Sequence, residues 1–222
     1  MSFISQQGVI TQPLTAGGVA YGNGSNAFMT GAGTAGQVLT SAGAGAPVWG
    51  AGGGLNLISS QTISTAVASV DFTSGINSTY DNYYVVFSNF KVQAGGRLRL
   101  RLRQGTSFVT ANYATFAITA ANGGSISSSG STTDTFLMST SGTPDTSSTF
   151  SGYFNLQSVN NATRRSQAAN GYVGMLCDSG LTMSSGIFTG TVDVAGAITG
   201  FQFLSAVGNL TAGTVALYGL AK

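Results

Sequence analysis

The chain has 222 residues, a formal net charge of +2, and charged side chains at only 6% of its positions, against about 25% in an ordinary soluble domain. It contains no histidine and a single cysteine, which excludes a Ser-His-Asp triad, a histidine-based zinc site and a thiolate cluster. Because 42% of the residues are hydrophobic, we expect the chain to fold around a core rather than to stay disordered.

The first 70 residues contain no charged side chain; the first charge is Asp71. A soluble monomer normally carries dispersed surface charge, so this region predicts a surface that other chains cover. The opening residues, MSFISQQGV, lack the basic and apolar regions of a secretion signal. No run approaches the roughly 20 apolar residues of a membrane helix, so we expect no membrane insertion.

Residues 17–49 contain a weak internal repeat, in which two glycines and one aromatic residue recur 21 positions later. The matching residues are Gly22, Gly24 and Phe28 in the first copy and Gly43, Gly45 and Trp49 in the second. Each copy is typical of a short strand, a Gly-x-Gly turn and an aromatic anchor. Units of this length bury their apolar face only by stacking on neighbours, so we expect packing between copies of the chain. Such packing would bury Val19, Tyr21, Phe28, Val38, Leu39 and Trp49 near a shared axis.

The segment GAGTAG, residues 31–36, matches the G-x-G-x-x-G pattern of dinucleotide-binding loops. That interpretation requires a strand before the motif, a helix after it and an acidic residue about 20 positions on. Here the strand-like QVLTS follows, and no acidic residue lies at that distance. The motif therefore predicts a turn between short strands.

The segment GAGGG, residues 50–54, predicts a hinge between an N-terminal anchor and stalk, residues 1–54, and a second domain, residues 55–222. No stretch beyond it has apolar residues at helical spacing. Strands are predicted at 55–63, 67–72, 80–92, 97–104, 112–120, 133–139, 149–159, 170–177, 185–194, 197–206 and 213–220. Many short strands separated by turns indicate an all-β sandwich or barrel. The length of this domain suits a jelly-roll-like β-sandwich, whose two sheets limit the number of exposed edges.

The segment YYVVF, residues 83–87, is apolar at every position. This pattern favours a central strand that is covered on both faces. One face would belong to the sandwich core and the other to a neighbouring subunit. A strand flanked by loop residues is the alternative.

Half of the eight Lys and Arg side chains lie in the seven residues RLRLRLR, residues 97–103. Alternation along a strand places Leu98, Leu100 and Leu102 on one face, toward the core, and Arg97, Arg99, Arg101 and Arg103 on the other. Three interpretations of the arginine row remain open. It is a solvated strand face, a set of partners for Asp or carbonyl groups across a subunit boundary, or a site for phosphate or carboxylate groups such as those of a bacterial polysaccharide. Nucleic acid is not expected, because no aromatic platform is interleaved with the arginines.

The acidic residues offer little for catalysis. They are Asp71, Asp81, Asp134, Asp145, Asp178 and Asp193. A glycoside hydrolase needs two carboxylates about 5 to 10 Å apart across a cleft, and the spacing indicates no such pair. We expect no enzyme and no cofactor. A glycan hydrolase that depends on Asp178 or Asp193 is a distant third hypothesis for the function.

Residues 18–52 resemble the connector of many bacteriophage tail-fibre and other virion appendage proteins. The resemblance rests on Gly33, Thr34, Gly36, Gln37, Val38, Leu39, Thr40, Ser41, Gly43, Gly45, Pro47 and Trp49. The remaining chain is similar to a jelly-roll-like module at the C-termini of such proteins. The matching segments are YDNYYVVFSNF, RLRLRLRQG with NYAT after it, and GNLTAGTVALYGL.

The resemblance implies a structural protein of the phage particle, usually a homotrimer, that has no catalytic residue. Its N-terminal region, residues 1–54, would attach to other virion proteins. Its C-terminal domain would be displayed at the particle surface for attachment to a host glycan. The alternative is a capsid decoration or head-fibre protein that stabilises the particle without a receptor.

Overall fold

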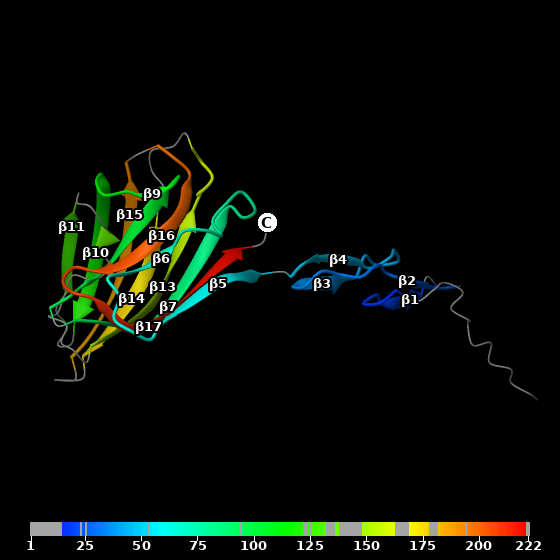
Figure 1. The fold of residues 1–222 in the computed structure, drawn as a ribbon, viewed down its shortest axis with the longest axis horizontal. Coiled ribbons are helices and arrows are strands. Elements are labelled where there is room, and N and C mark those ends of the chain that lie inside the picture. The colour runs from blue at the N-terminus through cyan, green and yellow to red at the C-terminus, as the bar shows by residue number, and fades with distance from the viewer. Residues whose placement is uncertain are drawn as a thin grey trace, which may run out of the picture. The chain divides into compact units, whose positions relative to one another are not determined.

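The computed structural model of the chain is all-β (Figure 1). It describes residues 15–22, 24, 26–52, 54–93, 95–121, 124, 126–131, 136–137, 148–162, 169–177, 182–193 and 195–220. Within these ranges there is no helix, and therefore none that could cross a membrane. The chain divides into two compact units, of which the first ends at Gly54 and the second begins at Leu55.

The N-terminal unit contains two antiparallel hairpins. Strand β1 (Ala20–Gly22) pairs with β2 (Ala27–Met29), and β3 (Gln37–Thr40) pairs with β4 (Val48–Ala51). The turns contain Gly24 and Gly43, both at positive φ, which glycine adopts without strain. GAGTAG forms the connection between the hairpins and leads into a strand, as its context predicts.

The second unit is a β-sandwich of two antiparallel sheets. The strand order in the larger sheet is β11-β10-β15-β14-β13-β7-β17-β5, and Figure 1 shows these strands running from β11 at one edge to β5 at the other. Their bounds are β5 (Leu55–Ile63), β7 (Asn82–Val92), β10 (Tyr113–Ala121), β11 (Ile126–Ser131), β13 (Thr149–Gln157), β14 (Ala169–Cys177), β15 (Thr182–Val192) and β17 (Leu210–Leu220).

The smaller sheet has the order β12-β8-β16-β6, and a short strand, β9, also pairs with β8. Their bounds are β6 (Ser69–Phe72), β8 (Leu98–Gln104), β9 (Ser107–Phe108), β12 (Phe136–Leu137) and β16 (Ile198–Ser205). From β5 to β8, and again from β15 to β17, the chain changes sheet at each step. This alternation is typical of jelly rolls and agrees with the predicted fold class.

Aromatic rings from both sheets meet in the core. The Phe203 ring on β16 lies 5.2 Å from the Phe87 ring and 5.8 Å from the Phe154 ring, centroid to centroid, and both partners are on the larger sheet. Leu98, Leu100 and Leu102 are fully buried, as the alternation of β8 predicts. Full burial of one such side chain contributes about 1.5 to 3 kcal/mol.

The central position of YYVVF is also observed, because β7 lies between β13 and β17. Tyr83, Val85 and Phe87 are buried in the core. Tyr84 and Val86 alternate to the opposite face of the larger sheet, where Val86 is exposed and Tyr84 is half-buried. Two strands, β9 and β11, were not predicted, and of the predicted strand at 133–139 only residues 136–137 are described.

Candidate functional site

The arginine row lies on the outer face of the smaller sheet. All four guanidinium-bearing side chains are half-buried rather than fully solvated. Their neighbours across β16 include Leu204 opposite Arg99 and Gln202 opposite Arg101. Gln202 in turn donates a hydrogen bond to the Asp71 carboxylate on β6 (Nε2 to Oδ1, 2.9 Å), so an acidic group lies two strands from the row.

Arg103 is held by its own chain. Its Nη1 donates to the Thr73 carbonyl oxygen at 3.1 Å and to the Thr199 hydroxyl at 3.3 Å. These contacts show that at least one guanidinium of the row has intramolecular oxygen partners. Because these two contacts occupy Nη1, Arg103 has fewer N–H donors for a ligand than a free arginine.

The residues predicted to pack between copies lie on the two N-terminal hairpins. Val19 and Val38 are 41% and 49% exposed in the single chain, and Tyr21, Phe28, Leu39 and Trp49 are half-buried. Tyr21 and Phe28 are cross-strand partners with ring centroids 5.8 Å apart. Among the described residues of this unit, no apolar side chain is buried.

Trp49 organises the connection between the two hairpins. Its indole Nε1 donates to the Gly31 carbonyl oxygen at 2.7 Å. A Cβ added to Gly33 would lie 2.7 Å from the indole ring, so glycine at this position allows the ring to pack directly on the backbone.

The candidate catalytic aspartates form no site within the described part of the chain. Asp134, Asp145 and Asp178 lie outside the described residues. Asp193 is exposed just after β15, and Asp81 is exposed just before β7. No three His, Cys, Asp or Glu side chains gather among the residues that the structure describes.

The most distinctive surface is the outer face of the larger sheet, away from the core. Seven large apolar or aromatic side chains on this face are between 37% and 62% exposed. They are Val86, Phe116, Tyr153, Tyr172, Leu176, Met183 and Ile187. An extended exposed apolar surface on a folded domain indicates a binding surface.

Strand register arranges this face in transverse rows. Tyr153 lies opposite Tyr172, Tyr172 opposite Ile187, and Ile187 opposite Ile118, on β13, β14, β15 and β10. We call these four residues the ridge. The Tyr153 and Tyr172 rings have centroids 6.1 Å apart and are 28° from parallel.

The row next to the ridge consists of small residues. Ser151 lies opposite Gly174, Gly174 opposite Ser185, and Ser185 opposite Ala120. Beyond this row, Leu176 and Met183 lie opposite each other and form the far wall. Small side chains between two bulky rows leave a groove of about 750 Å³, which is in the range of ligand sites.

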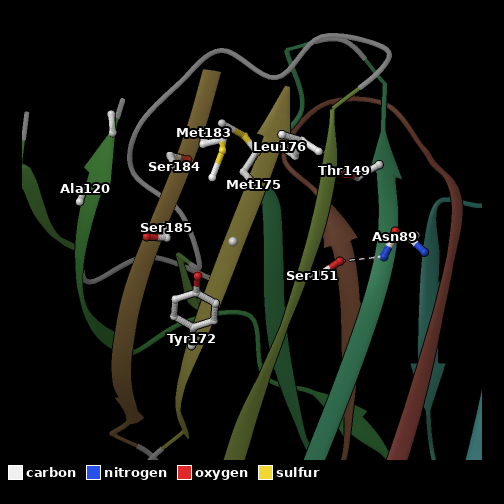
Figure 2. A pocket seen from close by; sticks show the side chains of 12 residues that line it. Asn89, Ala120, Thr149, Ser151, Tyr172, Met175, Leu176, Met183, Ser184 and Ser185 are labelled. Atoms are coloured by element: carbon white, nitrogen blue, oxygen red, sulfur yellow. Dashed lines mark hydrogen bonds between the residues drawn. The ribbon is translucent and has the colours of Figure 1, made fainter. Parts of the chain in front are cut away.

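The phenol ring of Tyr172 extends from the ridge across the floor of this groove. A Cβ added to Gly174 would be 3.4 Å from the Tyr172 Oη and 3.7 Å from its Cε1, so the phenol extends over the glycine. Figure 2 shows the Tyr172 ring face-on above its strand, with Ser151 and Ser185 to either side. Ser151 Oγ also accepts a hydrogen bond from the Asn89 backbone N–H at 3.0 Å.

A second, smaller hollow of about 370 Å³ lies on the other side of the ridge. Its polar residues are Asn155 and Asn170, which lie opposite each other with Nδ2 of the first 3.4 Å from Oδ1 of the second. Thr189 lies opposite Asn170 and continues the row. We call this the amide hollow.

The two hollows are electrically neutral. No residue that lines either of them is an Asp, Lys or Arg. The Lys91 side chain is nearby, on β7 opposite Thr149 at one end of the groove. On the same face, burial raises the pKa of Tyr84 above its usual value of 10.0, and the nearby Tyr153 raises it further, so this phenol is uncharged at neutral pH.

Sequence reasoning missed this surface. Tyr153, Tyr172 and Gly174 all lie within predicted strands, and alternation could have assigned them to one face. The pairing of β13, β14, β15 and β10 is what brings them together.

No protein-family model, curated protein sequence or solved structure matches the chain.

Proposed function

We propose that the protein is a structural component of a bacteriophage particle, a short self-associating fibre that displays its β-sandwich at the particle surface for attachment to a host glycan. The N-terminal hairpins associate between three copies and connect them to other virion proteins. The sandwich supplies the surface that meets the host. The function is structural and adhesive and needs no catalytic residue.

One observation carries this proposal: the N-terminal unit has apolar side chains but buries none of those that are described. Moving a large apolar side chain from full exposure to full burial contributes about 1.5 to 3 kcal/mol, and each of these six partly exposed side chains, on two hairpins with no charge, would gain a part of that when other copies cover it. Ordering a glycine-rich backbone costs about 1 to 2 kcal/mol per residue, so the hairpins need that additional burial. The sandwich differs, because it has its own core.

Light scattering on the purified full chain tests the self-association. We expect a mass three times that of one chain. Val38→Asp places a charge on an exposed position of β3 that would be covered in the trimer, and it should lower the mass to that of the monomer. Ala44→Asp is the matched control, because the same charge in the exposed turn should leave the mass unchanged. A wild-type chain that is monomeric at micromolar concentration contradicts the proposal.

The position on the particle needs a second measurement. Antibodies against the chain, viewed on phage particles by electron microscopy, should label an external appendage. Binding of the purified protein to host cells would support a role in attachment. A trimer that labels the capsid and binds no cells would favour the decoration protein instead.

A further inference from the structure

We propose that the groove between the ridge and the Leu176–Met183 wall binds an uncharged oligosaccharide, with the Tyr172 ring as the stacking surface. This inference rests on the proposed function, since it names the glycan class and the site for the attachment step. It places that site on the larger sheet rather than on the arginine row.

The shape of the groove fits a short linear chain. Its floor crosses β13, β14, β15 and β10, three strand spacings that together span about 14 Å. The ridge and the far wall are four residues apart along each strand, or about 13 Å between Cα rows. A slender, extended ligand can lie between them across the strands.

The chemistry of the lining also fits a sugar. The exposed face of the Tyr172 ring offers an apolar surface to the C–H face of a pyranose, while its hydroxyl remains available for a hydrogen bond. Ser151, Ser185 and Thr149 bring hydroxyl groups, which both donate and accept hydrogen bonds, as sugar hydroxyls do.

Polar side chains also lie on the other side of the ridge. Across the ridge, the Asn155 and Asn170 amides supply further donors and acceptors.

Charge selects the class of glycan. An acidic polysaccharide requires cationic partners, and arginine is the preferred partner of its carboxylates and phosphates. The arginine row lies on the outer face of the other sheet, and no cationic residue lines the groove. Binding to a neutral lining involves no ion pair, so it should not weaken with salt.

A second copy of the chain is the competing occupant. Wherever aliphatic side chains of that copy cover the serine and threonine hydroxyls of the groove, each hydroxyl left unpaired costs about 1 to 3 kcal/mol. A polyhydroxylated ligand avoids that cost. The sugar is therefore the better match to this floor.

The test uses the full chain on an array of bacterial surface oligosaccharides that contains both neutral and acidic members. The main variant is Gly174→Val, whose new side chain fills the floor and displaces the Tyr172 ring. Its Cβ meets only ordinary contact distances, and valine suits a strand better than glycine, so thermal stability should hold or rise. Ser185→Val fills the adjacent floor position. Thr191→Val, on the same face but lining neither hollow, is the matched control.

We expect wild type and Thr191→Val to bind one or more neutral oligosaccharides with no loss between low and high salt. Gly174→Val and Ser185→Val should lose that binding, and Tyr172→Ala should weaken it about tenfold. The light-scattering mass should be the same for all five proteins.

Three results would overturn the inference. One is wild-type binding to no neutral member, or to acidic members only. Another is neutral binding that survives both floor substitutions. The third is a fall in mass for Gly174→Val, which would assign the groove to a second copy. If the wild-type chain is a trimer, any of these results contradicts only the glycan site and not the proposed fibre function. A monomeric wild-type chain would contradict the proposed function itself.

Discussion

The hydroxyl of Tyr113 connects the two sheets through a pair of hydrogen bonds, and its removal should be costly. Tyr113 is on β10 of the larger sheet, with its ring fully buried. Its Oη accepts a hydrogen bond from the Leu102 backbone N–H at 2.8 Å and donates to the Val109 carbonyl at 3.0 Å. Tyr113→Phe keeps the ring and deletes these two bonds.

The size of the loss follows from which groups water can reach. Leu102 is fully buried, so its N–H would be left without a partner at a cost of about 1 to 3 kcal/mol. Val109 is half-buried, and its carbonyl can be rehydrated at lower cost. We expect Tyr113→Phe to destabilise the sandwich by about 2 kcal/mol, which lowers Tm by about 4 to 8 °C in a domain of this length.

Tyr83→Phe provides the internal comparison. The Tyr83 ring is equally buried, but its Oη bonds with the backbone N–H and carbonyl of Asn77, both at 2.9 Å. Asn77 is exposed, so water can replace the hydroxyl and the cost should stay near 0.5 to 1 kcal/mol. Differential scanning calorimetry on the full chain measures both. If Tyr83→Phe lowers Tm as much as Tyr113→Phe, the reasoning from water access is wrong.

Three further outcomes are expected. Gly33→Ala should shift the fluorescence of Trp49, the only tryptophan, because the new methyl group meets the indole ring. Gly31→Ala is the control, since the space around its Cβ is open and the spectrum should not change. Equal spectra for the two variants would refute the contact. Arg103→Gln should lower the free energy of unfolding by about 1 kcal/mol in denaturant titrations, because two hydrogen bonds to the guanidinium are lost, and no change would indicate a solvated side chain. Because the folded-state pKa of Tyr84 is raised, its contribution to stability is complete below the unfolded value of 10.0 and is lost as pH rises above it. Tyr84→Phe should remove one phenolate transition above pH 10.0 from an ultraviolet titration of the full chain, and a titration curve that is unchanged above pH 10.0 would contradict the raised pKa.

The parts of the fold that depend on short-range pattern could be predicted from the sequence. Alternation in RLRLRLR placed Leu98, Leu100 and Leu102 in the core, since the period of a strand fixes its two faces. The all-β class followed from the same signal. By contrast, β11 has the sequence ISSSGS, which is typical of a loop, and it forms a strand through pairing with β10.

The candidate binding groove could not be predicted in the same way. Gly174 and Ser185 are unremarkable small residues in separate strands, and they form a floor only because β14 and β15 pair in that register. A shift of one residue would place Gly174 opposite a core residue and remove the groove. Register over distant strands depends on the packing of the whole sandwich, which no local pattern encodes.

The first and last strands of the sandwich are neighbours, with Leu55 directly opposite Leu220 in the β5–β17 pair. The domain therefore enters and leaves at one point on the edge of the larger sheet. Its two ends can be joined by a short peptide and new ends opened at another surface turn, which makes the sandwich a candidate for circular permutation. For the same reason, a fluorescent protein or affinity tag fused after the last strand starts beside β5. A designer who wants a probe near the groove should insert it in a loop instead.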